Sequence, residues 1–235
     1  MNNGFHQRTA ALIGSAGLKR LAASWVAVIG LGGVGSFALE ALARSGIGRL
    51  TIVDHDIVEL HNTNRQLLAI RSNLGRLKTE AAAERIYNID PGIKVEGISA
   101  RYHSDNHDTI ICKEMSYVID AIDEVEAKIA LITACVNDNI PVISSMGTAR
   151  RLNPAKLLLD DISNTKNCTL ARKVRKGLRK AGVEKGVEVL YSIEEPVSAD
   201  TTALGSMVFV PGSAGLLLAA RVIEILLNKD KKREA

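Results

Sequence analysis

The sequence predicts an α/β protein built on a Rossmann-type, mostly parallel sheet flanked by helices. Short apolar runs alternate with segments of helical spacing over the first two thirds of the chain. A glycine-rich loop joins the first of these runs to the first helical segment. Strands that alternate with helices favour right-handed βαβ units and therefore a parallel sheet. After residue 150 the alternation becomes less regular, which indicates an α+β C-terminal extension.

The expected elements follow one another in a regular order. Apolar runs predict core strands at Trp25–Ile29, Arg49–Val53, Ser116–Ile119 and Pro141–Ser144, and alternation predicts one more at Lys94–Ile98. Helical spacing predicts core helices at Val34–Arg44, Arg76–Asn88 and Glu124–Asn137. The extension adds strands at Lys156–Asp160 and Val187–Tyr191, and helices at Cys168–Ala181 and Ser213–Leu227.

The length of 235 residues suits a single domain, which we expect to cover residues 1–235. Within it we expect an N-terminal helical arm (5–22), a nucleotide-binding core (23–150), a substrate and dimer region (151–228) and a charged tail (229–235).

Composition narrows the class of protein. The cysteines Cys112, Cys135 and Cys168 lie too far apart for a Cys-x-x-Cys zinc or redox motif, so we expect buried free thiols. We find no apolar stretch of the roughly 20 residues that span a bilayer and no apolar signal region, which predicts a cytoplasmic protein without a membrane partner. The net charge of +4 permits a nucleic-acid partner without demanding one.

The glycine loop carries the first functional signal. Gly30, Gly32 and Gly35 have the Gly-x-Gly-x-x-Gly spacing of a phosphate-binding turn, and Gly33 adds a further small residue. Such a loop lets the backbone approach a phosphate at the start of the following helix. Asp54 ends the next strand, about 20 residues on, where an acid can accept hydroxyls of a ribose. These features predict a nucleotide without separating NAD from ATP, and a glycine turn without a ligand is the alternative.

Polar residues after the second strand favour ATP. Arg65 and Lys78 are cations that an NAD dehydrogenase does not evidently need, whereas adenylation needs them to stabilise the departing pyrophosphate. Asn62 and Gln66 lie in the same loop as Arg65. Each cation taken singly is also compatible with an ordinary surface position.

A second acidic pair, Asp120 and Asp123, follows the Ser116–Ile119 strand. Ligands bind at the carboxyl ends of parallel strands, and Mg²⁺ prefers one or two carboxylates together with phosphates. Asp123 is therefore the metal candidate. Its alternative role is the N-cap of the helix that starts at Glu124, and one residue could do both.

The expected helix at Cys168–Ala181 is strongly basic. Its cations are Arg172, Lys173, Arg175, Lys176, Arg179 and Lys180. They form either a solvated helix face or a surface that contacts RNA.

Together these motifs resemble the ThiF/MoeB/HesA superfamily of adenylating enzymes, which are related to ubiquitin-activating enzymes. The residues that carry the resemblance are Gly30-Leu31-Gly32-Gly33-Val34-Gly35-Ser36, Asp54-x-Asp56, Asn62-x-x-Arg65-Gln66, Lys78 and Asp120-x-x-Asp123. The chain is most similar to the branch that dehydrates threonylcarbamoyladenosine in tRNA, through residues 8–147 above all. This further similarity includes Arg8-Thr9, Leu12-x-Gly14, the run from Glu40 to Gly48, Asn88-Ile89-Asp90-Pro91 and Tyr191-Ser192-x-Glu194.

The resemblance implies an activity and a site. Members of this branch use ATP to activate the threonyl carboxylate of the modified adenosine, and intramolecular attack then expels AMP and closes a ring. By the same match Asp54 would hold the ribose, Asn62, Arg65 and Lys78 the triphosphate, and Asp123 the Mg²⁺, with Arg65, Lys78 and Asp123 catalytic. The rest of the implied ATP site is Asp56, Gln66, Asp120 and the loop glycines. A homodimer is implied, in which Arg8 reaches the ATP of the partner subunit and is counted with the catalytic residues.

One departure from relatives limits the choice of substrate. Relatives that activate ubiquitin-like sulfur carriers usually carry paired Cys-x-x-Cys zinc motifs, and this sequence has none. An activator of such a carrier is the alternative function, and a non-catalytic nucleotide-sensing module is a third. Cysteine desulfurase or sulfur-acceptor partners follow only from the resemblance. We expect no catalytic cysteine, because a tethered nucleophile needs none.

Overall fold

The computed structural model describes residues 4–197 and 204–228, and contains one seven-stranded sheet in the order β3-β2-β1-β4-β5-β7-β6. The strands are β1 (Trp25–Ile29), β2 (Arg49–Val53), β3 (Lys94–Ile98), β4 (Tyr117–Asp120), β5 (Val142–Ser145), β6 (Leu157–Asp161) and β7 (Glu188–Ser192). All neighbouring strands are parallel except β6, which runs antiparallel to β7 at one edge. The predicted Rossmann-type sheet is confirmed, and the C-terminal region completes it.

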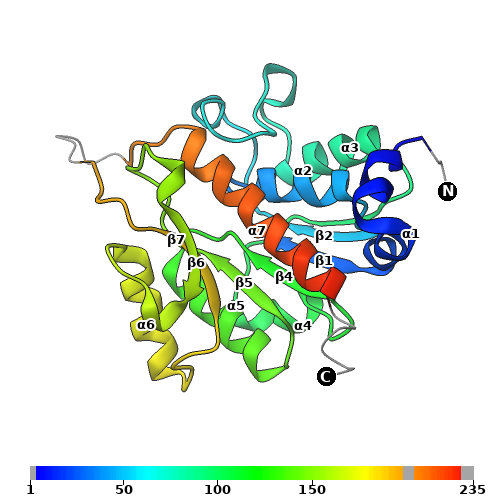
Figure 1. Cartoon of the computed structure of the whole chain (residues 1–235). Coiled ribbons are helices and arrows are strands. Elements are labelled where there is room, and N and C mark those ends of the chain that lie inside the picture. The colour runs from blue at the N-terminus through cyan, green and yellow to red at the C-terminus, as the bar shows by residue number, and fades with distance from the viewer. Residues whose placement is uncertain (1–3, 198–203, 229–235) are drawn as a thin grey trace.

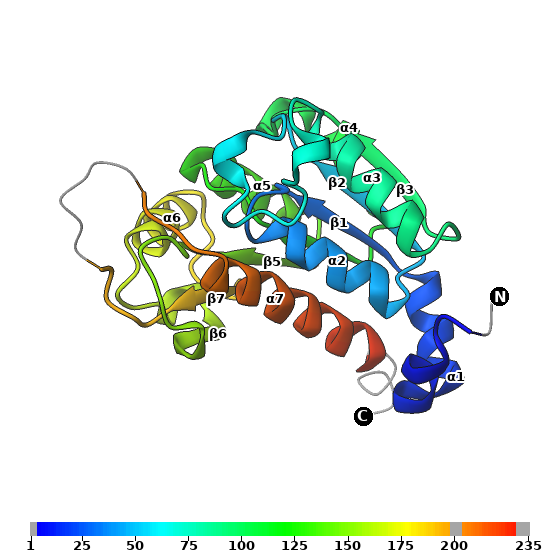
Figure 2. The same ribbon diagram turned by 90° about the horizontal axis from the view of Figure 1, so that it is seen from above.

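Helices cover both faces of the sheet, as Figures 1 and 2 show. One face carries α2 (Gly35–Ser45), α3 (Lys78–Ile89) and α7 (Phe209–Asn228), with α1 (Gln7–Ala23) packed beside the end of α7. The other face carries α4 (His107–Ile110), α5 (Val125–Asn137) and α6 (Thr169–Lys180). Each face therefore has its own apolar core against the sheet.

Strand order places a crevice in the middle of the sheet. β1 pairs with β2 on one side and with β4 on the other, so Ile29 lies beside both Val53 and Asp120. The chain reverses its direction of travel across the sheet at this point, and such switch points are where open α/β sheets bind ligands. The loops after β1, β2 and β4 therefore meet at one edge.

Element boundaries agree with the prediction to within two residues, except for the last helix. That helix begins at Phe209 rather than Ser213, with Pro211 inside its first turn. Proline is tolerated there because the first helical N–H groups have no partner within the helix. The predicted charged tail (229–235) lies outside the described residues.

The last helix also corrects a second expectation. By length and composition α7 could cross a membrane, since it has 20 residues and a mean hydropathy of 1.7 over its best window. Half of that window is buried inside the protein. Gly215 explains the close packing, because a Cβ there would meet the backbone of Val34 and Ala38 at the start of α2. The burial is that of a core helix.

The cysteines are free, as expected. Cys135 and Cys168 are buried, but Cys112 is only partly buried, contrary to the expectation.

Candidate active site

A cleft of about 810 Å³ opens at the carboxyl ends of β1, β2, β4 and β5. This volume lies within the range of roughly 300–1,000 Å³ that is typical of small-molecule sites. The predicted site residues that line it are Gly30, Gly32, Gly33, Asp54, Asp56, Asn62, Arg65, Gln66, Lys78 and Asp123. Gly35, Asp120 and Arg8 do not line it. The fold therefore brings most of the predicted residues to one place.

The glycine loop is shaped by two close approaches. Gly30 has φ of +92°, and a Cβ there would lie 2.7 Å from the carbonyl oxygen of Ala121. A Cβ on Gly35 would overlap the carbonyl oxygen of Gly30. Gly32, in contrast, has only the Nε2 of Gln66 within 4 Å, at 3.9 Å. The first and last glycines thus form the turn, and the middle one leaves open space beside the start of α2.

Asp54 attaches this loop to the end of β2. Its Oδ2 accepts a hydrogen bond from the N–H of Leu31 at 2.6 Å, and its Oδ1 accepts one from the N–H of Asp56 at 2.8 Å. The side chain is almost fully buried. Buried carboxylates are stable when both oxygens accept hydrogen bonds, so Asp54 fixes the shape of two loops at once.

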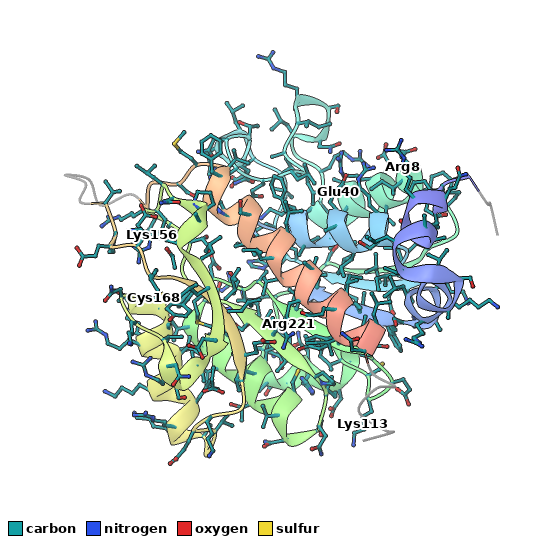
Figure 3. All side chains as sticks on the ribbon, in the orientation of Figure 1. Arg8, Glu40, Lys113, Lys156, Cys168 and Arg221 are labelled. Carbon is teal, nitrogen blue, oxygen red and sulfur yellow. The ribbon has the colours of Figure 1, made fainter. Side chains whose placement is uncertain are left out.

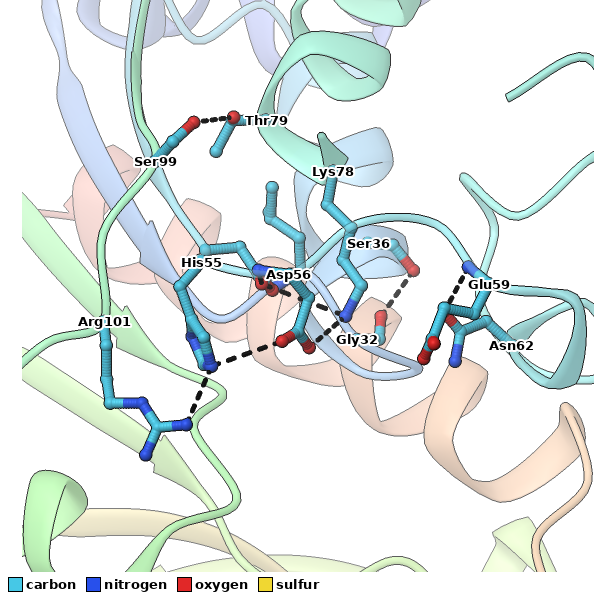
Figure 4. Close-up of polar contacts among 12 residues, drawn as sticks. Gly32, Ser36, His55, Asp56, Glu59, Asn62, Lys78, Thr79, Ser99 and Arg101 are labelled. Carbon is cyan, nitrogen blue, oxygen red and sulfur yellow. Dashed lines mark hydrogen bonds and ion pairs between the residues drawn. The ribbon is translucent and has the colours of Figure 1, made fainter. Parts of the chain in front are cut away.

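Lys78 is a buried cation between two carboxylates (Figure 4). Its Nζ lies 2.7 Å from Oδ2 of Asp56 and 3.9 Å from Oδ1 of Asp54, and its side chain is 5% exposed. Lys78 is also the first residue of α3, so the helix start sets its position. The cation is thus held inside the cleft before any ligand arrives.

Asp56 is ionised at neutral pH. Partial burial acts to raise the pKa of this carboxyl, but the hydrogen bond and charge of Lys78 outweigh burial and lower it, with smaller contributions from His55 and Arg101. The cation of Lys78 therefore favours the ionised form of Asp56.

Arg65 is held by its own loop. Its Nη1 donates to the carbonyl of His61 and to Oδ1 of Asn64, each at 2.9 Å. Asn62 is buried, and its Oδ1 accepts the N–H of Glu59 at 3.0 Å, which closes a 3₁₀ turn. Asn62 thus shapes the loop that presents Arg65 to the cleft.

Asp120 lies beneath the cleft in a fully buried charged cluster that the sequence analysis missed. Its Oδ2 accepts from Nζ of Lys128 at 2.8 Å and from Oγ of Ser144 at 2.6 Å, while Oδ1 accepts the N–H of Ile122 at 3.1 Å. Asp120 and Lys128 are both 0% exposed. The cluster holds the strand end from which Ala121 and Asp123 reach the cleft. A lysine on the apolar side of the helix at 125–137 was the available signal.

Asp123 does not cap the next helix. The helix α5 begins at Val125, and Glu124 occupies its N-cap position without a side-chain bond. The N-cap alternative is therefore wrong, because the helix starts one residue later than expected. Asp123 is exposed at the cleft, where its carboxylate is available to a ligand.

Arg8 and Cys168 lie far from each other (Figure 3). Arg8 is an exposed residue of α1, which precedes β1 and packs at the opposite edge of the sheet from the cleft. Cys168 lines the cleft, and its Sγ accepts the N–H of Ala171 at 3.4 Å as the N-cap of α6. This cysteine has a structural role at the helix start.

Comparison with known proteins identifies the family of this chain. The family model described as "ThiF family" matches residues 6–235. A tRNA threonylcarbamoyladenosine dehydratase of Bacillus subtilis is 40% identical over 92% of this chain and 92% of its own. Two crystal structures of E. coli tRNA N6-threonylcarbamoyladenosine dehydratase superpose with TM-scores of 0.93. The complex with AMP is 36% identical and covers 97% of this chain and 96% of its own. The complex with ATP is 34% identical and covers 98% and 96%. This chain therefore belongs to the ThiF family.

Proposed function

We propose that this protein is an ATP-dependent tRNA-modifying ligase. It converts N6-threonylcarbamoyladenosine in tRNA to its cyclic form with net loss of water. A relative named tRNA threonylcarbamoyladenosine dehydratase matches nearly the whole chain. Crystal structures of a similar dehydratase contain AMP or ATP. The observation that carries the proposal is that the buried Lys78 and Arg65 line the same cleft as the glycine loop.

The cleft residues suit binding of a triphosphate. Open backbone at Gly32 and the uncapped start of α2 favour phosphate, because unpaired N–H groups and the helix dipole attract anions. Lys78 and Arg65 then neutralise the charge that develops on pyrophosphate. Asp54 remains the proposed ribose ligand. Asp120 lies beneath the cleft and supports the site without contacting the nucleotide.

The proposed reaction has two steps. A threonyl carboxylate oxygen attacks the α-phosphorus of ATP, and the bond to pyrophosphate breaks to give an acyl-adenylate. An atom of the same threonylcarbamoyl group then attacks the activated carbonyl, expelling AMP and losing one proton. Because nucleophile and electrophile belong to one molecule, proximity replaces an enzyme thioester.

Magnesium fits the acidic part of the cleft. Asp123 is exposed at the cleft and makes no ion pair in the described part of the chain, so its oxygens are available to a hard cation. Bound Mg²⁺ would neutralise part of the negative charge of the triphosphate. Asp54 and Asp56 also lie nearby but are occupied by backbone and Lys78.

A homodimer is proposed because Arg8 cannot serve the cleft of its own subunit from α1. Exposed apolar side chains occur on α1 and α7, at Leu12, Phe209, Leu216 and Leu217, and could form contacts with a second copy. A cytoplasmic location and contacts with a cysteine desulfurase or sulfur acceptor stay predictions from the sequence.

The direct test is to compare modified nucleosides in tRNA from cells with and without this protein. The cyclic nucleoside should be replaced by its open form when the protein is absent, and purified protein with ATP should restore it while releasing AMP and pyrophosphate. Persistence of the cyclic form without the protein would defeat the proposal. Exchange of pyrophosphate stimulated by a Gly-Gly-ended carrier protein would instead favour the alternative function.

A further inference from the structure

The outer face of α6 carries positive charge that the proposed chemistry does not use. Six of the twelve residues of this helix are cations: Arg172, Lys173, Arg175, Lys176, Arg179 and Lys180. All but Lys173 surround a surface hollow of about 440 Å³. Within residues 4–197 and 204–228, none of the six forms an ion pair with a carboxylate. Arg175 is partly buried and donates hydrogen bonds to the carbonyls of Ile162 and Thr165, while the other five side chains are exposed. We call the six residues the α6 basic face, and within the described ranges their charges lack a paired carboxylate.

Packing holds the α6 basic face rigid. The opposite side of the helix buries Ala171, Val174 and Leu178 in the core beside β7. A Cβ on Gly177 would overlap the side chain of Ile129, so α6 and α5 pack closely at this point. The helix is thus fixed by its apolar side, even though cations one turn apart, such as Arg172 and Lys176, repel each other.

The same packing argues against insertion of α6 into a membrane. An amphipathic helix binds a bilayer by burying its apolar face among the lipids. The apolar face of α6 is already buried inside the protein, so only the charged face remains for a ligand. A ligand of the charged face is therefore recognised by its negative charge, which both an anionic lipid surface and a nucleic acid carry.

Position then favours RNA. The start of α6 forms part of the cleft wall, through Cys168, Thr169, Leu170 and Lys173. From there the helix extends about 18 Å. A nucleic-acid duplex with the charge spacing of DNA carries roughly ten phosphates over that length. A nucleotide whose modified base enters the cleft would thus lay its neighbouring backbone along this helix.

We propose that the α6 basic face binds the phosphate backbone of the RNA whose modified nucleotide reacts in the cleft. This inference rests on the proposed function, since it identifies how that substrate is gripped. Contacts of this kind carry affinity rather than sequence specificity, and they weaken with salt.

The test changes three exposed cations of the α6 basic face together: Arg172→Gln, Lys176→Gln and Arg179→Gln. The matched control replaces the exposed lysines Lys19, Lys94 and Lys113 by glutamine. Lys19 and Lys113 precede β1 and β4, and Lys94 begins β3, so all three lie toward the amino ends of the strands, away from the cleft. Binding to tRNA that carries threonylcarbamoyladenosine is measured by fluorescence anisotropy at several salt concentrations. ATP affinity is measured alongside as a check of folding.

The α6 variant should bind tRNA roughly 10- to 100-fold more weakly, and its plot of log K against log salt should flatten by about 2–3 units. The control should match the wild type in both. Wild-type affinity and slope in the α6 variant would overturn the inference while leaving the proposed function intact. Should the triple variant lose ATP binding, Arg179→Gln alone decides, with an expected loss of about one unit of slope. If the wild type does not cyclise the modified nucleoside, the proposed function fails. The binding data then still test whether the α6 basic face binds RNA.

Discussion

At the residue scale, the cleft is organised by charges that are positioned before the ligand binds. Lys78 is held by Asp56 and Asp54, and Arg65 by the carbonyl of His61. Preorganised donors need no rearrangement when charge develops in a transition state, which is why they are effective catalysts. Asp54, the proposed ribose ligand, also has a structural role, because its carboxylate accepts a hydrogen bond from the glycine loop.

Arg65→Ala should lower kcat/KM by roughly 10²–10³, because it removes a donor to the departing pyrophosphate. AMP formation with modified tRNA measures this. Arg71→Ala is the matched control, since Arg71 is exposed in a neighbouring 3₁₀ turn and does not line the cleft. A variant at position 65 with the wild-type rate would refute the assignment.

Cys168→Ser should retain the rate to within a few-fold, because serine keeps the N-cap and the proposed ring closure needs no thioester. The measurement is cyclic nucleoside formed per enzyme under single-turnover conditions. Complete loss of cyclisation in a folded variant would show that the thiol takes part in the chemistry.

At the element scale, one carboxylate fixes two helices that carry the site. Glu40 of α2 accepts from Nε and Nη2 of Arg85 on α3, at 2.6 and 3.0 Å, and from Nε of Arg44 at 2.7 Å. The start of α2 follows the glycine loop, and the start of α3 carries Lys78. Burial acts to raise the pKa of Glu40, but hydrogen bonds and charge from Arg85 and Arg44 prevail and lower it.

Glu40→Gln should therefore reduce the free energy of unfolding by about 1 kcal/mol at neutral pH, the upper range for ion pairs that reach solvent. Because the folded pKa is lowered, this contribution is present above the unfolded value of about 4.3 and disappears as pH falls through the folded pKa. Urea unfolding at pH 7 and near pH 3 measures it, with the exposed Glu114→Gln as control. A difference that persists at low pH would point to packing instead.

At the scale of the whole molecule, the cleft lies at the carboxyl ends of the strands, whereas the N-terminal arm precedes β1. Arg8 on that arm lies far from Cys168 in the cleft wall (Figure 3). An Arg8 that acts in catalysis must then come from another subunit. Closed two-fold dimers place identical surfaces together, so each subunit would complete the site of the other.

Mixing two inactive variants tests this arrangement. Arg8→Ala and Lys78→Ala should each be inactive alone, but subunit exchange would create mixed dimers with one intact site. Random exchange should restore about a quarter of the wild-type activity, since half the dimers are mixed and each has one site. The double variant Arg8→Ala/Lys78→Ala mixed with the Lys78→Ala variant is the control and should recover none. No recovery in the test mixture would contradict an arginine supplied by the partner.

Local sequence signals account for most of the fold and much of the site. Apolar runs located the central strands, because burial on both faces of a parallel sheet makes such strands continuously apolar, and alternation located β3. Helical spacing located the long helices but missed the short helix α4. Glycine spacing identified the loop, because Gly30 and Gly35 meet backbone atoms where a side chain would not fit. The early start of α7 was missed because Pro211 suggests a helix break but lies in the permissive first turn.

The sequence by itself determined the Rossmann-type sheet, the phosphate loop and the cations that stand near it, because each depends on residue type at fixed local spacing. Only the tertiary structure decided which of the predicted acidic residues lie at the cleft. Asp120 and Ser144 became neighbours through strand register, and Lys128 reached them from a helix on the other side of a loop. Asp120 is fully buried beneath the cleft, whereas Asp123 lines it. Burial and strand pairing are properties of the whole packed chain, which no local pattern of residues specifies.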